Sequence, residues 1–354
     1  MLVGAPRRGT PDAVQADEHL EELARLADTA GAEIAGRIVQ RIEKPTSHFY
    51  IGEGKVAEVG ALAEETGATL VVFDEELAPV QGKNLERALD RRVMDRSELI
   101  LDIFATRARS NEAKLEVELA QLEYLLPRLA RMWVHLSRIR GGIGLRGPGE
   151  TQLETDRRMI RRKISRLKEK LEKVERHREV VRGGRRPIPT AALVGYTNAG
   201  KSSLLRALSG ADTFVEDRLF ATLDTLTREM SLGNGRRLRL IDTVGFIRKL
   251  PHHLVASFRA TLEEAGHADV LLHVVDASHP QWEEQVEVVN RVLDDLAVRQ
   301  CPVVHVFNKM DRLPDDRAFQ EGTGSRYEHS VFVSAKANQV GPLVEKLAVL
   351  QRRE

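Results

Sequence analysis

The sequence predicts an α/β protein: a small N-terminal α/β domain with a long helical hairpin, then a larger α/β domain with a mostly parallel sheet and helices on both faces. Three observations predict this. Short apolar segments alternate with helical ones near both ends of the chain, and leucines at a 3,4 spacing fill its middle. A glycine-rich loop also separates an apolar strand from a helix in the C-terminal half.

Composition is that of an ordinary soluble protein. The chain has 354 residues, of which 42% are hydrophobic and 30% are charged, and its formal net charge is +1. No apolar run approaches the ~20 residues that a membrane span needs, and no secretory signal is visible. The single cysteine, Cys301, excludes an internal disulfide and suits a reducing compartment. We therefore expect a cytoplasmic protein of two or three domains, and a monomer.

The N-terminal third predicts an arm and a domain. Residues 1–16 contain glycine, proline and two arginines without periodicity, and we expect a flexible arm there. Residues 17–110 alternate between apolar and amphipathic segments, which predicts a small domain with a mostly parallel sheet. We expect helices at 19–30, 55–66 and 79–89 and strands at 33–42, 69–74 and 92–95.

Residues 111–181 predict a helical hairpin. Two sets of apolar residues follow a 3,4 alternation that is typical of a coiled-coil seam. They are Leu115, Leu119, Leu122, Leu126, Leu129, Trp133 and Leu136, and then Ile160, Ile164, Leu167, Leu171 and Val174. The glycine-rich segment 141–150 is the expected tip, and Pro127 should kink the first helix or start a second segment. The Gly/Pro-containing residues 182–189 read as a linker.

The hairpin is strongly basic. Residues 157–186 contain 14 Lys/Arg against 4 Glu, and the tip carries Arg138, Arg140 and Arg146. Such a charge run is often only a solvated helix face, but basic flanks around an apolar seam also suit a polyanion-binding projection. Because aromatic residues are sparse there, phosphate or shape recognition is favoured over base stacking.

Gly195–Ser202 matches the phosphate-binding pattern G-x-x-x-x-G-K-[ST]. An expected strand at 190–194 precedes it and an expected helix at 203–208 follows it, which is the context that this loop requires. Backbone N–H groups would surround the phosphates, Lys201 would reach the β- and γ-phosphates, and Ser202 would ligate Mg²⁺. The alternative is a glycine-rich turn before a helix.

Three later motifs occur in the order of a P-loop GTPase domain, which we place at 190–354: D-x-x-G at 242–245, N-K-x-D at 308–311 and S-A-K at 334–336, whose backbone would contact the guanine O6. Asp242–Gly245 is a D-x-x-G motif, which would hold Mg²⁺ through water at Asp242 and face the γ-phosphate at Gly245. In the N-K-x-D motif, Asp311 can accept hydrogen bonds from guanine that adenine cannot donate. The expected nucleotide-binding residues are Gly195, Tyr196, Thr197, Asn198, Ala199, Gly200, Lys201, Ser202, Ser203, Asp242, Thr243, Gly245, Asn308, Lys309, Asp311, Ser334, Ala335 and Lys336.

The threonine-rich segment 217–228 is the expected first switch. Thr222 is our choice for the residue that closes on Mg²⁺ and the γ-phosphate, with Thr225 and Thr227 as alternatives. Lys201, Thr222 and Gly245 are then the expected catalytic residues. Phe246 stands where many GTPases carry a glutamine that orients the attacking water, so we expect slow intrinsic hydrolysis. Asn198 suggests that K⁺ could bind beside the phosphates.

Several long motifs resemble the HflX family of ribosome-associated GTPases. They are D-R-S-E-L-I-L-D-I-F-A-T-R-A at 95–108, V-E-L-A-Q-L-E-Y-L-L-P-R at 117–128, the tip G-G-I-G-L-R-G-P-G-E-T-Q-L-E with Asp156-Arg157-Arg158, F-A-T-L-D and D-T-V-G-F. The resemblance covers roughly residues 20–340. It implies a GTPase that binds the large (50S) ribosomal subunit and can split stalled or idle ribosomes, with the R-G-P-G-E tip approaching the peptidyl-transferase region. We also expect Arg157 and Arg158 to bind rRNA, with Arg138, Arg140 and Arg146.

The sequence departs from the pattern of this family in places. Ser110–Ala113 stands where Thr-x-Glu-Gly is usual, Glu116 where glutamine is usual, and Thr225 where proline usually follows F-A-T-L-D. We also expect the extra C-terminal domain of longer members to be absent, because only 18 residues follow Lys336.

Two other functions fit the same residues. The protein could be an rRNA-binding module that is gated by nucleotide and hydrolyses it only incidentally, or an RNA remodeller driven by ATP or GTP. Stimulation of hydrolysis by large subunits and competition by ATP distinguish these functions.

Overall fold

The computed structural model describes residues 1–132, 148–183, 188–210, 218–233, 235–250, 266–295 and 301–351. The chain forms two compact units. The first comprises Met1–Thr106 and Leu115–Lys170, and the second comprises Arg107–Lys114 and Leu171–Glu354. Within the described residues, no helix is both long enough and apolar enough to cross a membrane.

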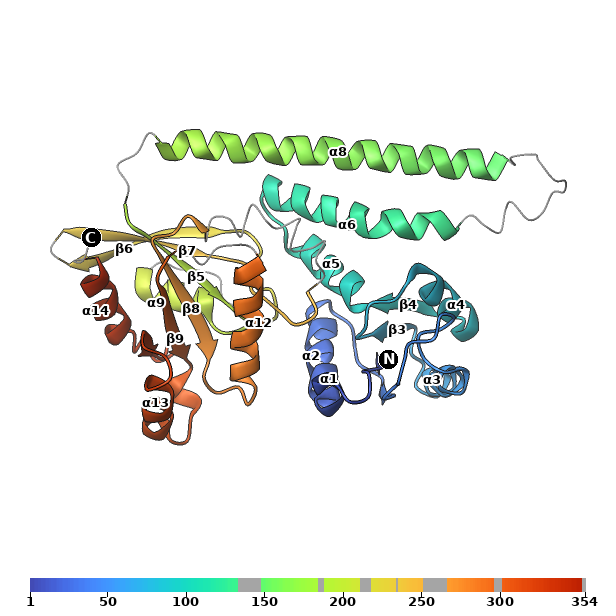
Figure 1. The fold of residues 1–354 in the computed structure, drawn as a ribbon, viewed down its shortest axis with the longest axis horizontal. Coiled ribbons are helices and arrows are strands. Elements are labelled where there is room, and N and C mark those ends of the chain that lie inside the picture. The colour runs from blue at the N-terminus through green and yellow to red at the C-terminus, as the bar shows by residue number, and fades with distance from the viewer. Residues whose placement is uncertain are drawn as a thin grey trace. The chain divides into compact units, whose positions relative to one another are not determined.

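The first unit contains a four-stranded parallel sheet of order β2-β1-β3-β4 (Figure 1). The strands are β1 (Leu2–Gly4), β2 (Arg37–Val39), β3 (Leu70–Phe73) and β4 (Arg92–Asp95). The helices around the sheet are α1 (Pro11–Val14), α2 (Ala16–Thr29), α3 (Glu53–Glu65), α4 (Pro79–Leu89) and α5 (Arg96–Arg107). Apolar residues of α3 and α4 share one core cluster with Val3, Val71 and Val93. On the opposite face Gly4 lies against Leu20 of α2.

The expectation of a flexible arm at residues 1–16 is wrong. Leu2–Gly4 forms β1, an inner strand of the sheet that pairs with β2 on one side and β3 on the other. Leu2 and Val3 are fully buried, and the N-terminal ammonium donates a hydrogen bond to the Leu70 carbonyl (3.0 Å). Three residues are too few to show a strand period, so long-range pairing decides this segment rather than local pattern.

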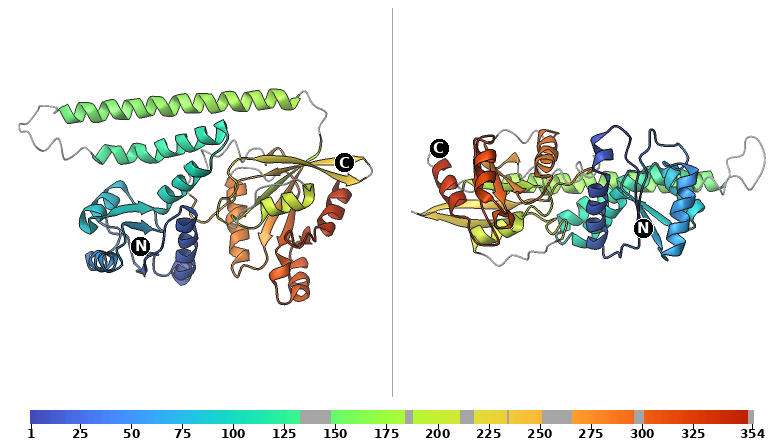
Figure 2. Two further views of the ribbon diagram at one scale, coloured as in Figure 1. Left: turned by 180° about the vertical axis from the view of Figure 1, so that it is seen from behind. Right: turned by 90° about the horizontal axis from the view of Figure 1, so that it is seen from below.

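The expected hairpin is formed by α6 (Asn111–Met132) and α8 (Pro148–Gly183), which lie side by side in Figures 1 and 2. The helix α6 continues through Pro127 instead of restarting there. Of the expected seam residues, Leu119 and Leu167 are buried, whereas Trp133, Leu136 and most of the tip lie outside the described residues. The helix α8 ends two residues inside the expected linker.

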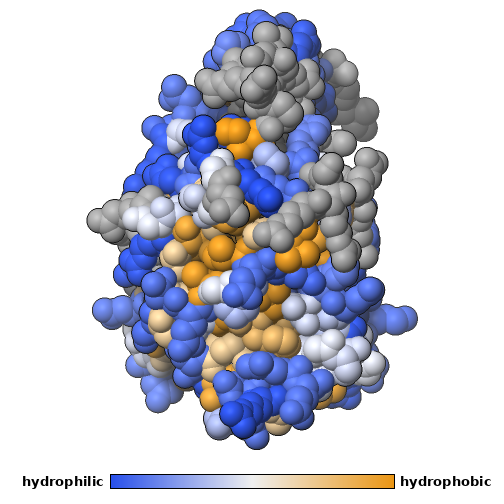
Figure 3. Space-filling model, turned by 90° about the vertical axis from the view of Figure 1, so that its left-hand side faces the viewer, coloured by the Kyte–Doolittle hydropathy of each residue, from blue (hydrophilic) through white to orange (hydrophobic). Residues whose placement is uncertain are grey.

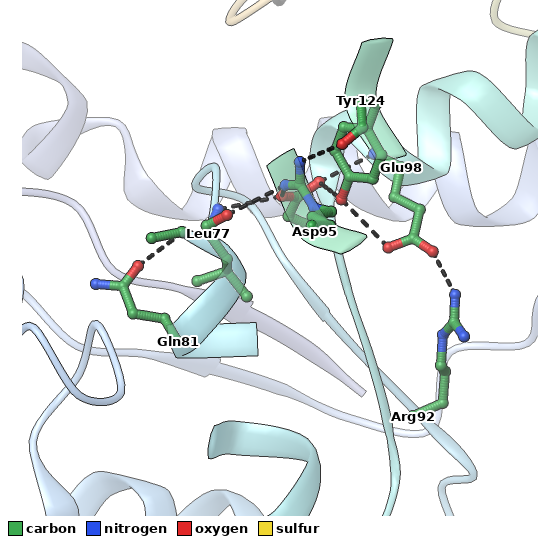
Figure 4. Close-up of polar contacts among 8 residues, drawn as sticks. Leu77, Gln81, Arg92, Asp95, Glu98 and Tyr124 are labelled. Carbon is green, nitrogen blue, oxygen red and sulfur yellow. Dashed lines mark hydrogen bonds and ion pairs between the residues drawn. The ribbon is translucent and has the colours of Figure 1, made fainter. Parts of the chain in front are cut away.

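A buried carboxylate joins α6 to the end of β4. Asp95 Oδ1 accepts hydrogen bonds from the Tyr124 hydroxyl (3.0 Å) and the Glu98 amide (2.9 Å). Asp95 Oδ2 accepts hydrogen bonds from Arg128 (2.9 Å) and from the Leu77 amide (3.1 Å) (Figure 4). Burial and the neighbouring Asp95 raise the pKa of the Tyr124 hydroxyl above its ordinary value. The four donors compensate for the burial of the Asp95 charge.

The second unit contains a six-stranded sheet of order β10-β9-β8-β5-β7-β6, in which only β6 is antiparallel to its neighbour among the described strands. The strands are β5 (Thr190–Gly195), β6 (Leu226–Gly233), β7 (Arg236–Asp242), β8 (Val270–Asp276), β9 (Val303–Asn308) and β10 (Ser330–Phe332). The helices are α9 (Lys201–Ser209), α12 (Trp282–Asp295), the short η1 (Met310–Arg312), α13 (Asp316–Gly324) and α14 (Gly341–Leu350).

Alternate residues of these strands face two different cores. Leu272 and Val304 pack with apolar residues of α9 and α14, whereas Val275 and Phe307 pack with residues of α12 and α13 on the other face. The predicted class, a mostly parallel sheet with helices on both faces, is confirmed. The side of the molecule shown in Figure 3, where α14 and β6 lie in Figure 1, carries an apolar area bordered by polar residues.

Candidate nucleotide-binding site

The phosphate-binding loop joins β5 to α9, as its pattern requires. Gly200 has φ +95°, and a Cβ there would overlap the side-chain nitrogen of Asn308. A Cβ on Gly195 would overlap the carbonyl oxygen of Val274 in β8. Both glycines are therefore required by close packing, because any side chain would displace Asn308 or the backbone of β8.

Lys201 is buried beneath this loop. Its Nζ donates hydrogen bonds to the carbonyl oxygens of Gly195 (3.1 Å) and Tyr196 (3.0 Å). Burial lowers the pKa of Lys201 from 10.5 to about 8, against the opposing effect of Asp242. An anion placed on the loop would raise this pKa again and so favour the charged form of the amine.

Three oxygens meet at the start of α9. Ser202 Oγ lies 2.6 Å from Thr222 Oγ1 and donates a 2.6 Å hydrogen bond to Asp242 Oδ2. Asp242 Oδ1 is buried and has no hydrogen-bond partner within the described residues, and burial raises the pKa of this carboxyl. Hydroxyl and carboxylate oxygens are the ligand types that Mg²⁺ prefers, so the residues present fit this ion.

The D-x-x-G segment is hydrogen-bonded along the phosphate-binding loop. Phe246 donates its N–H to the Gly195 carbonyl (3.0 Å) and accepts from the Thr197 N–H (2.7 Å). A Cβ on Gly245 would lie 2.7 Å from Thr197 Cα, so glycine is needed there. The Phe246 side chain is 1% exposed and acts as a packing anchor.

The expected first switch is attached to the same loop. Phe220 donates its N–H to Thr197 Oγ1 (2.8 Å), in a backbone conformation with φ +53°. Of the three candidate threonines, Thr222 lies at Ser202, whereas Thr227 is an exposed residue of β6 opposite Ile241. Thr225 directly precedes β6. The described part of the pocket over the loop is lined by both switch segments.

The base-recognition motifs lie together at the ends of β9 and β10. Asn308 donates to the Ala199 carbonyl (3.0 Å) and accepts from the Ala335 amide (3.0 Å). Ser334 Oγ donates to Asp311 Oδ1 (2.5 Å), while Lys336 is exposed. The two motifs are therefore fixed to each other and to the phosphate-binding loop.

The sequence motifs did not predict one residue that organises this site, Asp276, and for Thr197, which they placed at the nucleotide, they did not predict its contacts with the switches. Asp276, at the end of β8, pairs with Lys309 at 2.7 Å, and Thr197 joins both switches to the loop. The position of Asp276 at the carboxyl end of an apolar strand is a usable signal. Thr197 was expected to bind nucleotide as part of the loop, but it occupies a variable position of the pattern, so its hydrogen bonds to the two switches had no such signal.

The expected rRNA-binding arginines are only partly described. Arg157 is half-buried and Arg158 is exposed on α8, where it lies 3.7 Å from Glu154. Arg138, Arg140 and Arg146 lie outside the described residues. Among the described residues, no group of three His, Cys, Asp or Glu side chains forms a metal-binding cluster.

Three family models match consecutive parts of the chain. They are described as GTP-binding GTPase N-terminal (residues 17–105), GTP-binding GTPase Middle Region (residues 107–185) and 50S ribosome-binding GTPase (residues 190–309). GTPase HflX of Caldanaerobacter subterraneus subsp. tengcongensis is 51% identical over 327 residues, which is 92% of this chain and 74% of the relative. GTPase HflX of Escherichia coli is 49% identical over 300 residues, or 84% and 70% of the two chains.

The chain belongs to the HflX family of GTPases. The resemblance found in the sequence is thus confirmed, and this HflX family member binds guanine nucleotides and hydrolyses GTP. Its fold is similar to that of a solved protein, SsGBP, in complex with GDP. The TM-score is 0.55 at 25% identity, and the match covers 99% of this chain and 98% of the other. The predicted enzyme class is confirmed with the family.

Proposed function

We propose that this HflX family GTPase binds the large ribosomal subunit in the cytoplasm through its rRNA, and couples GTP binding and hydrolysis to ribosome dissociation or rescue. The observation that carries the proposal is the distribution of charge on α8. Toward α6, Lys163 pairs with Glu118 (2.5 Å) and Lys168 pairs with Glu123 (2.8 Å). Cations on that side of α8 are therefore neutralised.

A second set of cations on α8 has no such partners. Arg162, Arg166, Lys170 and Lys173 are exposed, and within the described residues none of them takes part in an ion pair. Their spacings of 4, 4 and 3 residues place them on one face of the helix. The cations of this face outnumber the exposed Glu169, which lies on it as well, and such an uncompensated excess of positive charge fits an RNA phosphate backbone.

The nucleotide site supplies the chemistry for this proposal. Ser202, Thr222 and, through water, Asp242 would hold Mg²⁺, which neutralises charge that develops on the phosphates. Lys201 and the Gly245 N–H would contact the γ-phosphate. Because the buried Phe246 offers no group to orient water, intrinsic turnover should be slow and the ribosome should stimulate it.

A monovalent cation is a further part of this proposal. Asn198 lies in the phosphate-binding loop with φ +60°, at the position from which a side-chain oxygen could hold K⁺ beside the phosphates. A bound cation would stabilise charge in the transition state, in place of an arginine from a partner. Turnover should then be faster in KCl than in NaCl, and equal rates would contradict this role.

The test of RNA binding compares two variants that each remove two positive charges. Arg162→Gln/Arg166→Gln alters the uncompensated face, whereas Lys163→Gln/Lys168→Gln alters the paired side. Sedimentation with 50S subunits should weaken about tenfold only for the first variant, with a salt dependence shallower by about two counterions. An equal loss of 50S binding in both variants would indicate that binding depends only on net charge. Unchanged binding in both variants would contradict the role of α8.

GTP hydrolysis measured with 30S, 50S or 70S particles, and with none, tests the coupling. Strong stimulation by 50S or 70S particles is expected. Unchanged hydrolysis together with intact binding would favour the nucleotide-gated binding module instead.

A further inference from the structure

The first switch makes a second attachment, away from the nucleotide. Asp224 accepts hydrogen bonds from the backbone N–H groups of Arg109 (3.0 Å) and Ser110 (3.2 Å) and from the Ser110 hydroxyl (2.5 Å). Residues 107–114 belong to the same compact unit as the GTPase sheet. The carboxylate thus binds the segment from which α6 starts.

Ser110 is itself the N-cap of α6. Its Oγ accepts the N–H of Ala113 (3.0 Å), and its carbonyl accepts the N–H of Lys114 (3.1 Å). Such a cap satisfies N–H groups that have no partner inside the helix. Asp224 therefore holds the residue that fixes the first turn of α6.

Asp224 is only two residues from Thr222. An extended chain covers at most about 7 Å over that distance, so fixing Asp224 limits the positions that Thr222 can take. Toward the N-terminus, Phe220 is held on Thr197. Toward the C-terminus, Leu226 pairs with Asp242 at the start of β6. Between these fixed points Asp224 is the side chain that ties the loop to α6.

We propose that Asp224 is a positioning residue for GTP hydrolysis. By accepting hydrogen bonds from Ser110 at the start of α6, it holds Thr222 beside Ser202. The inference rests on the proposed role of Thr222 as a Mg²⁺ ligand. The contact couples the two segments in both directions. A ligand that favours the closed first switch must equally favour the position of the first turn of α6 in which Ser110 is bound to Asp224. A movement of α6 imposed by a partner would then alter GTP turnover through this contact.

The first test measures GTP turnover of the full chain as a function of GTP and Mg²⁺ concentration. Asp224→Ala should lower kcat about tenfold, the effect of losing a charge-assisted hydrogen bond, with less than about twofold change in KM for GTP. It should also raise the Mg²⁺ concentration required for half-maximal rate. Ser110→Ala should show part of this loss, and Ser110→Thr, which keeps the hydroxyl, should restore it.

The second test measures hydrogen exchange at the amides of Ser110 and Ala113. In the unaltered protein these amides should exchange about tenfold more slowly with a non-hydrolysable GTP analogue than with GDP. In Asp224→Ala this difference between nucleotides should disappear. A merely structural contact would change exchange equally in both states, and that result would overturn the proposal.

Asp315→Ala is the matched control. Asp315 caps α13 by accepting the Ala318 N–H (3.1 Å), so this change also removes a capping carboxylate from the same unit. It should leave kcat and the Mg²⁺ requirement unchanged. Equal losses in the two variants would indicate general destabilisation and would overturn the proposal.

The outcome also separates the two roles at the switch. A normal kcat in Asp224→Ala, together with a reduced kcat in Thr222→Ala, would overturn only the positioning role of Asp224. A normal kcat and Mg²⁺ requirement in Thr222→Ala would instead contradict the proposed magnesium site.

Discussion

Ser202 Oγ and Thr222 Oγ1 lie 2.6 Å apart, although 20 residues separate them in the chain. Ser202 is fixed at the start of α9 by the phosphate-binding loop, whereas Thr222 comes from a connection without regular structure. Their meeting means that the first switch is closed on the loop in this structure. The closed arrangement makes the role of each threonine testable.

Thr222→Ala should reduce kcat at least about tenfold and increase the Mg²⁺ requirement, because a hydroxyl ligand is lost. Thr222→Ser should keep most of the activity. The comparison variants are Thr225→Ala and Thr227→Ala, which should stay within about twofold of the unaltered protein. A larger loss in either comparison variant than in Thr222→Ala would contradict the assignment.

Asp311→Ala should weaken GTP binding about 10- to 100-fold, since hydrogen bonds from guanine to a carboxylate are charge-assisted. ATP binding should not weaken by a similar factor, because adenine has no hydrogen bond to Asp311 to lose. Fluorescence competition between a labelled GTP analogue and unlabelled GTP or ATP measures both values. Ser334→Ala, which removes the hydroxyl that orients Asp311, should have a smaller effect. Retained guanine preference in Asp311→Ala would contradict this account.

Nucleotide binding should take up a proton at alkaline pH. The pKa of Lys201 is about 8 in the free protein because the amine is buried, and phosphates beside it should raise that pKa. Between about pH 8 and 10.5 the free amine is therefore largely neutral and the bound one is charged, so affinity should fall as pH rises through this window. Calorimetry in buffers of different ionisation enthalpy, at about pH 9, measures the uptake.

The same titration at about pH 7 is the internal control for Lys201. There the amine is protonated in both states, so its uptake should vanish. Equal uptake at the two pH values would assign the proton to another group.

Asp95→Ala should destabilise the first unit by about 3 kcal/mol, because it removes the buried carboxylate to which the partly buried Arg128 and three other donors bind. Hydrogen exchange of β3 and β4 amides follows this unit separately from the GTPase sheet. Glu21→Gln removes the exposed pair with Arg37 (side chains 52% and 42% exposed) and should cost less than about 1 kcal/mol. Similar effects of the two changes would show that the Asp95 network contributes little.

Local patterns were sufficient for most of the fold. The strand 92–95 has the predicted bounds, and the strand expected at 190–194, before the phosphate-binding loop, is β5 (Thr190–Gly195). In β5, burial on both faces leaves a continuous apolar run, which can be recognised in isolation. The prediction for residues 1–16 was wrong, because the three residues of β1 are too few to show the alternation of a strand.

The sequence by itself determined the order of the motifs, the guanine-nucleotide chemistry, the hairpin and the family, since each depends on residue types at fixed short spacings. Only the tertiary structure decided which threonine meets Ser202, which α8 cations remain uncompensated and that Asp224 holds the start of α6. These relationships join residues far apart in the chain, such as Asp224 and Ser110. Their distances follow from the packing of whole elements, and no local spacing encodes that packing.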